Sequence, residues 1–186
     1  MWDYSIESIG LKMTLASLGE PVKAELPEKY DWRFYQPGDE VYWAKMWKSA
    51  GGFKSEEAAL ETFKRDFPDE EALKQRMIFL TDDGVPFATV AVWFGEMPEQ
   101  GRLHWVCIDE AHQNQGLSKV LIALSLDLCR KLGCTHAYLL TNTPNWVAIR
   151  MYHRFGFVPC SRGERDNLGW QIVSERSGID FMKYID

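Results

Sequence analysis

A short polar loop, QNQGLS at residues 113–118, is the first stretch of the chain that can do chemistry. It follows the strand-like run WVCID and precedes the apolar run LSKVLIALSLDL, so the chain passes here from a strand to a helix. A glycine at such a junction lets a ligand approach the bare backbone, and the free N–H groups of the helix start attract anions. The pattern indicates a phosphate-binding turn. A glycine turn without a ligand is the alternative, and no GxGxxG or P-loop pattern is present.

A second pattern pairs Asn145 with Tyr152, seven residues later on an expected helix at 145–155. Two helical turns separate them, so both side chains can point toward one ligand. A phenol is protonated at neutral pH and can give its proton to a leaving thiolate. The alternatives are that Tyr152 packs beside Trp146, Ile149 and Phe155, and that Asn145 is only a helix N-cap.

A base is needed if an amine is to attack, because amines are mostly protonated at neutral pH. His104 is the first candidate because it titrates in the right range, and Glu96 and Asp109 are the others. A purely structural strand histidine is the alternative for His104. Cys107 can in principle carry an acyl group.

The two patterns and their separation resemble the GNAT superfamily of acyl-CoA-dependent N-acyltransferases. The pyrophosphate loop of that family, Arg/Gln-x-x-Gly-x-Gly/Ala, matches Gln113, Gly116 and Ser118. The later motif of the family matches Asn145, Ala148, Tyr152, Gly156 and Phe157. The resemblance is specific over about residues 78–158, and the serine at position 118 departs from the small apolar residue of the pattern.

The resemblance implies a GNAT fold in which pantetheine enters a splay between the strands RLHWVCID and HAYLLT. Tyr152 would be the general acid to the coenzyme A sulfur, and His104 is kept as the base. The resemblance also implies direct transfer from coenzyme A to the amine, without an acyl group on Cys107. The cofactor-binding residues it implies are Val106, Cys107, Ile108, Gln113, Asn114, Gln115, Gly116, Leu117, Ser118, Asn145, Ala148 and Tyr152. Acetyl-CoA is the expected cofactor.

Hydrophobic periodicity supplies the elements that must position these residues. Helices are expected at 39–51, 55–67, from 117 onward and at 145–155, and strands at 30–37, 76–81, 85–95, 102–109 and 136–141. The runs WQIV (170–173) and IDFMKYI (179–185) are read as terminal strands. Residues 1–29 are left open as an added strand or an N-terminal arm. Together these predict an α/β fold: a mixed, part-antiparallel sheet of about six or seven strands with helices on both faces, in one domain over 1–186.

The aromatic and acidic residues before the hairpin can line the amine side through ring faces and carboxylates. They are Asp31, Trp32, Phe34, Tyr35, Glu40, Tyr42, Trp43 and Trp47. The alternative is that the rings bury the first helix on the sheet while the acids face water.

The overall composition and net charge limit the range of binding partners to be expected. With 186 residues and a net charge of -6, an extended nucleic-acid footprint is not expected. No signal peptide or membrane span is read, so a cytoplasmic protein, monomer or homodimer, is expected. Four cysteines and four histidines lack zinc spacing, so no metal is expected. The predicted function is an N-acetyltransferase that moves an acetyl or other short acyl group to a primary amine of a small molecule or peptide. A non-catalytic acyl-CoA-binding or regulatory module is the alternative.

Overall fold

The computed structural model describes residues 2–185, which fall into two compact units. Unit 1 holds the residues up to Gly19, Phe94–Arg102 and those from Cys134 onward, and unit 2 holds Glu20–Trp93 and Leu103–Gly133. The described strands form a seven-stranded sheet in the order β2-β3-β4-β5-β6-β1-β7. Strand β5 (Gln100–Ile108) begins in unit 1 and ends in unit 2. The predicted α/β class with a sheet of six or seven strands is confirmed.

Unit 2 contains three consecutive strands that pair antiparallel. Strand β3 (Met77–Asp82) pairs with β2 (Tyr30–Phe34) on one side and with β4 (Val85–Phe94) on the other. The β3–β4 connection is the predicted DDG turn, in which Asp83 and Gly84 both have positive φ. A two-residue hairpin turn of this type needs that conformation to match the twist of its strands. Most side chains of β3 and β4 are buried, so this hairpin is part of the core of unit 2.

Four helices complete unit 2. Helices α1 (Glu40–Ser49) and α2 (Glu56–Asp66) contact each other, and α4 (Leu117–Lys131) follows the polar loop. All three were expected from their periodicity. Helix α3 (Glu70–Arg76) was not expected, because seven residues give only two turns of periodic signal. Its start is nevertheless ordinary: the Asp69 carboxylate accepts a hydrogen bond from the Ala72 N–H at 3.0 Å, as an N-cap does.

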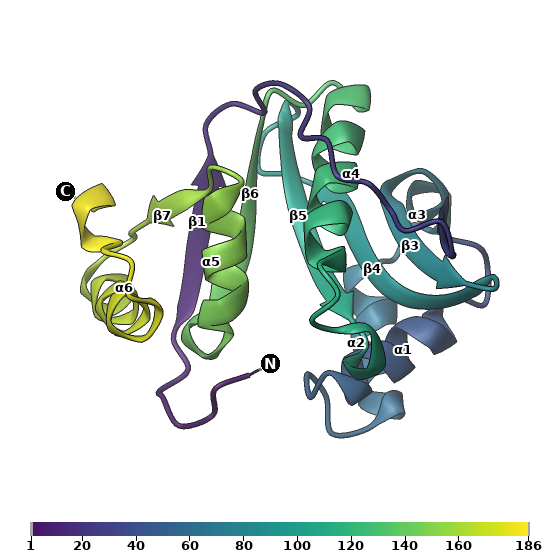
Figure 1. Cartoon of the computed structure of the whole chain (residues 1–186), viewed down its shortest axis with the longest axis horizontal. Helices are drawn as coiled ribbons and strands as arrows, with labels where there is room; N and C mark the ends of the chain where they lie inside the picture. Colours follow the sequence, from purple (N-terminus) through teal and green to yellow (C-terminus); the bar gives the residue numbers. More distant parts are fainter. Residues whose placement is uncertain (1, 186) are drawn as a thin grey trace. The chain divides into compact units, whose positions relative to one another are not determined.

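In unit 1 the segment that was left open as strand or arm contributes a strand. Strand β1 (Gly10–Leu15) lies between β6 (His136–Asn142) and β7 (Val158–Cys160) (Figure 1). It pairs antiparallel with both. A 3-10 turn, η2 (Thr143–Asn145), leads from β6 into helix α5 (Trp146–Arg154). The alternation of buried and exposed residues along β1 is that of a strand with one face in a core.

The two terminal strands expected from WQIV and IDFMKYI were wrong. WQIV lies inside helix α6 (Glu164–Ser177), and residues 182–184 form a 3-10 turn, η3 (Met182–Tyr184). The buried residues of α6 explain the error, because their spacing of three, four and seven residues is helical: Asp166, Gly169, Trp170 and Val173. A Cβ on Gly169 would come within 2.9 Å of the Leu11 side chain, so this glycine lets the helix pack closely on β1.

No helix among residues 2–185 has the length and apolar character that crossing a membrane would require.

Candidate functional site

The loop at 113–118 adopts the conformation that its sequence indicated. Asn114 has φ 62° and Gly116 has φ 77° with ψ -1°, both in the left-handed region. Asparagine tolerates this region better than most residues, and glycine adopts it without steric cost. A Cβ placed on Gly116 would meet nothing within 4 Å. The glycine is therefore required by its φ and not by packing, and the space beside it is open to a ligand.

Helix α4 starts without a side-chain cap. Gly116 is its N-cap residue, and no side chain caps the first turn. The Lys119 N–H donates to the Gly116 carbonyl oxygen at 3.1 Å. The N–H groups that precede it in the first turn have no acceptor within the helix, and the helix dipole adds positive potential at this end. Leu117 is 1% exposed and anchors the helix start in the core. The start of α4 is thus rigidly placed and chemically suited to an anion.

Two glutamine side chains shape this loop from inside. The Gln113 amide donates to the Ile108 carbonyl oxygen at 3.0 Å, and the Gln115 carbonyl oxygen accepts from the Tyr30 hydroxyl at 3.0 Å. The Gln115 amide also donates to the Ala111 carbonyl oxygen at 3.4 Å. Because these side chains are engaged by the protein, the backbone of the loop is the part that can present itself to a ligand.

His112 braces the turn that leads into the loop. Its Nδ1 lies 2.6 Å from Asp109 Oδ1, and its Nε2 lies 3.6 Å from Asp82 Oδ2. Its ring stacks on Phe87 with centroids 4.1 Å apart. Asp109 also accepts from the His112 backbone N–H at 3.0 Å. Asp109, one of the expected base candidates, is therefore occupied in holding this turn.

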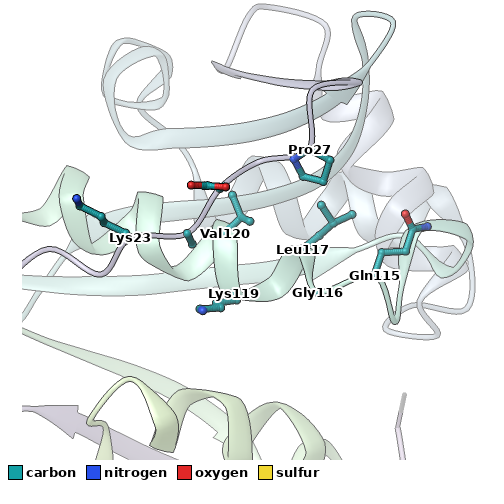
Figure 2. Close-up of a pocket in the computed structure, with 9 residues that line it drawn as sticks. Lys23, Pro27, Gln115, Gly116, Leu117, Lys119 and Val120 are labelled. Atoms are coloured by element: carbon teal, nitrogen blue, oxygen red, sulfur yellow. The ribbon is translucent and has the colours of Figure 1, made fainter.

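A pocket of about 420 Å³ opens beside the start of α4 (Figure 2). One wall is the segment that precedes β2, and the other is the loop with the first turn of the helix. The lining residues are Lys23, Ala24, Glu25, Pro27, Gln115, Gly116, Leu117, Lys119 and Val120. Two lysines and an uncapped helix start make the pocket electropositive, with Glu25 as the opposing charge. Sequence reasoning missed Lys23 and Lys119, because no motif marks them.

The other expected cofactor contacts of unit 2 lie at the end of β5. Val106 and Ile108 are partly exposed, whereas Cys107 is 5% exposed. Burial, with the nearby Asp109 charge, raises the pKa of the Cys107 thiol well above its usual range. The thiol is therefore neutral at physiological pH, and only a thiolate is a good nucleophile. This supports the expectation that Cys107 does not carry an acyl group.

The base candidates differ in their surroundings. The His104 side chain is 12% exposed, and its Nε2 lies 3.8 Å from Asp66 Oδ2. Its ring lies 5.5 Å from that of Phe67. Glu96 is 62% exposed and forms an ion pair with Lys12 at 2.8 Å. Asp66 was not found from the sequence, since it lies far from His104 along the chain and belongs to no motif.

The remaining expected site residues belong to unit 1. Asn145 occupies the N-cap position of α5 without making a side-chain capping bond, and Ala148 lies one turn later. Tyr152 is 7% exposed, and its ring contacts that of Phe157 with centroids 6.2 Å apart. The expected residues thus form two groups, one at the start and along the length of α5 and one around β5 and α4 of unit 2.

The aromatic residues before the hairpin are mostly structural. Tyr35, Trp43 and Trp47 are buried, and Trp43 packs on the ring of Phe63 with centroids 5.3 Å apart. The Tyr35 hydroxyl donates to the Glu40 carboxylate at 2.9 Å. These rings pack α1 into the core, which was the alternative interpretation. Trp32 and Tyr42 remain exposed.

Within residues 2–185 no group of three or more His, Cys, Asp or Glu side chains is placed to hold a metal ion. Cys107, Cys129, Cys134 and Cys160 are all free thiols.

Comparison with known proteins identifies the protein family to which the chain belongs. Residues 39–157, well over half of the 186, match the model of the acetyltransferase (GNAT) family. The chain therefore belongs to the GNAT family.

Two curated relatives match in part. The mycothiol acetyltransferase of Nocardia farcinica (strain IFM 10152) is 31% identical over 88 residues, which are 45% of this chain and 29% of that protein. Acetyltransferase Atu2258 of Agrobacterium fabrum (strain C58) is 39% identical over 51 residues, which are 27% of this chain and 36% of that protein. The matches thus span about a third of the length of these relatives.

Solved structures share the fold at low identity. The GCN5-related N-acetyltransferase from Sphaerobacter thermophilus superposes with a TM-score of 0.67 at 18% identity, over 82% of this chain and 49% of that one. Ard1 from Thermoplasma volcanium gives a TM-score of 0.59 at 20% identity, over 72% of this chain and 85% of that one. These similarities support the GNAT fold that the motifs implied.

Proposed function

We propose that the chain is an N-acetyltransferase that transfers an acetyl or other short acyl group from acyl-CoA to a primary amine of a small molecule or peptide. The observation that carries this proposal is the start of α4. There Gly116, with φ 77° and open space where a Cβ would stand, precedes a helix with no side-chain cap. Membership of the GNAT family and the names of the two curated relatives support the same activity.

The residues present fit acyl-CoA. The backbone N–H groups of residues 115–118 would hold the pyrophosphate, and Lys119 and Lys23 in the neighbouring pocket add positive charge. The backbone of Val106, Cys107 and Ile108 would hold the pantetheine arm by strand-like hydrogen bonds. Gln113 and Asn114 would shape the loop, and Leu117 would anchor it. When bound, the cofactor supplies an activated acyl carbon in a thioester.

The chain itself would move two protons. His104 would accept the proton that the amine nitrogen loses as its lone pair forms the new N–C bond. Tyr152 would donate its phenolic proton to the sulfur as the C–S bond breaks, and Asn145 and Ala148 on the same helix would border the cofactor. His104 then releases its proton to solvent and Tyr152 regains one. The products are an amide and a free thiol.

Binding of acetyl-CoA, measured by isothermal titration calorimetry, is the first test. We expect saturable binding in the micromolar range, and the absence of heat at near-millimolar acetyl-CoA would remove the proposal. Release of free thiol over a broad panel of primary amines is the second test. Binding without thiol release on any amine would favour the non-catalytic acyl-CoA module instead.

The proton donor can be tested in the same assay. We expect Tyr152→Phe to lower kcat by about 10²-fold with little change in the affinity for acetyl-CoA, because the ring still fills its site. An unchanged kcat would remove Tyr152 as the acid while leaving the proposed reaction in place.

A further inference from the structure

Two consecutive residues of β5, His104 and Trp105, face the same carboxylate. Successive residues of a regular strand point to opposite faces of the sheet. Trp105, however, has φ 53°, a conformation that a bulky side chain rarely adopts. This local break in the strand explains how both rings reach the end of α2, where Asp66 is the last helical residue.

The contacts at Asp66 are shared between its two oxygens. The Trp105 indole N–H donates to Oδ2 at 2.9 Å, and His104 Nε2 lies 3.8 Å from the same oxygen. Arg65 Nε donates to Oδ1 at 2.8 Å. The rings of Phe67 and Trp105 each lie 5.5 Å from that of His104. His104 thus has two aromatic rings as neighbours and a carboxylate near one of its nitrogens.

The carboxylate keeps its charge in this setting. The Asp66 side chain is 19% exposed. Burial raises its pKa, but the hydrogen bonds from Arg65 and Trp105 outweigh that effect, and the net pKa lies below the usual value. The carboxylate of Asp66 faces His104 Nε2, and the Arg65 guanidinium contacts the other oxygen of that carboxylate. The negative charge of the Asp66 carboxylate lies 3.8 Å from His104 Nε2 and is partly shielded from water, so it favours the protonated form of the His104 imidazole.

We propose that Asp66 is a positioning residue for His104: it turns Nε2 toward its carboxylate and sets the pH at which His104 takes up a proton. This inference rests on the proposed function, in which His104 is the base. The carboxylate then offsets the positive charge that the ring acquires, as in other carboxylate–histidine pairs.

The Trp105 indole N–H opposes the effect of the Asp66 carboxylate on the protonation of His104. Its indole N–H is bonded to the oxygen that faces His104, so it neutralises part of the charge that His104 senses. Replacement of Trp105 by phenylalanine keeps a ring and removes the donor. The two partners therefore predict shifts of opposite sign, which general damage to the fold would not produce.

The test is the titration of the His104 imidazole, followed by NMR in the protein without substrate. The His104→Gln variant identifies its signal among the four histidines. We expect Asp66→Asn to move the midpoint of the titration to lower pH by about one unit, and Trp105→Phe to move it to higher pH by several tenths. Glu61→Gln, which removes an exposed carboxylate from the same helix, is the matched control and should leave the midpoint unchanged.

Kinetics on a reactive amine give the second readout. The acid limb of kcat/KM against pH should follow the NMR midpoint in each variant. An unmoved midpoint in Asp66→Asn, equal shifts in Asp66→Asn and Trp105→Phe, or an acid limb that stays fixed while the midpoint moves would each overturn the proposal. If the unmodified protein transferred no acyl group to any amine, the proposed function would fail, and the NMR titration would still decide whether Asp66 controls His104.

Discussion

Helices α2 and α4 begin in opposite ways, although both belong to unit 2. Helix α2 is capped by Ser55, whose hydroxyl accepts from the Ala58 N–H at 3.2 Å, and it has two glutamates in its first turn. Hydrogen bonds from its own backbone N–H and from Ser55 lower the pKa of Glu57. Helix α4 begins at a left-handed glycine with no side-chain cap and no acidic residue in its first turn.

The difference separates a helix start that serves stability from one that is suited to a ligand. At α2 the protein supplies its own anion and its own hydrogen-bond acceptor, so the N–H groups and the helix dipole are already satisfied. At α4 neither is supplied, and lysines line the neighbouring pocket. Under the proposed function, the phosphates of acyl-CoA take the place that Glu57 and Ser55 take in α2.

The largest expected effect is that of closing the open space at Gly116. Gly116→Ala places a Cβ in the path of the cofactor and strains a residue whose φ is 77°. We expect the affinity for acetyl-CoA, measured by calorimetry, to fall about 50-fold, or about 2.3 kcal/mol. Gly133→Ala is the matched control, because Gly133 follows the other end of α4 with φ 81° and equally open space. Equal losses of affinity in both variants would contradict a ligand at Gly116.

The next test makes the start of α4 resemble that of α2. Ser118→Asp adds a carboxylate to the first turn, where it repels phosphate but interacts favourably with the helix dipole. We expect the affinity for acetyl-CoA to fall about tenfold while the free energy of unfolding rises by about 0.5 kcal/mol. Ser118→Asn separates charge from size and should change both quantities little. An Asp variant that binds acetyl-CoA normally would argue against an anion at this turn.

A smaller effect is expected from the pocket lysines. Removing Lys23 or Lys119 takes one positive charge from the pocket beside Gly116. Each alanine variant should weaken acetyl-CoA binding about threefold at low salt and less at 0.5 M salt, because exposed charges are screened. Lys131→Ala, in the last turn of α4, is the control. Weakening that does not depend on salt would point to a packing role.

Removing the N-cap of helix α2 should destabilise the fold without changing the affinity for acetyl-CoA. Ser55→Ala removes the capping acceptor, so we expect the free energy of unfolding to fall by about 1 kcal/mol with no change in acetyl-CoA affinity. Denaturant unfolding measures the first quantity and calorimetry the second. Loss of affinity in this variant would mean that the two helix starts are not independent.

The smallest expected effect is on the pH dependence of the free energy of unfolding. Because the pKa of Glu57 is lower in the folded protein, its contribution to stability is present above the unfolded value of about 4.3 and is lost as the pH falls through the folded value. Glu57→Gln should therefore flatten the decline of stability below about pH 5. Unfolding curves from pH 3 to pH 7 would show it, and a decline as steep as that of the unmodified protein would contradict the assignment.

Much of the fold could be predicted from local sequence, but not all of it. Helices α1, α2 and α4 carry long periodic patterns, and the DDG turn requires residues that tolerate positive φ. The prediction of a strand at WQIV failed because a run of four residues, three of them apolar, fits a strand or a helix equally well. The helical spacing of the residues that α6 buries, together with the close approach of Gly169 to Leu11, shows how that segment packs as a helix.

Some residues of the candidate site could likewise be singled out from the local sequence, and others could not. Gly116 was singled out because a glycine between a strand-like run and an apolar helical run is visible in the local sequence, and the structure gives it a φ of 77°. Asp66 was not found, because its contacts with His104 and Trp105 join residues 38 and 39 positions apart. Lys23 also lacks a local signal and reaches the pocket through the path of the segment before β2.

The amino-acid sequence by itself determined the family, the position at which helix α4 begins and the order of most elements, because each depends on a few neighbouring residues. The tertiary structure alone decided which side chains surround His104, which rings are buried in the core and that β1 lies between β6 and β7. These depend on contacts between distant segments, whose free energy is settled only when the chain packs.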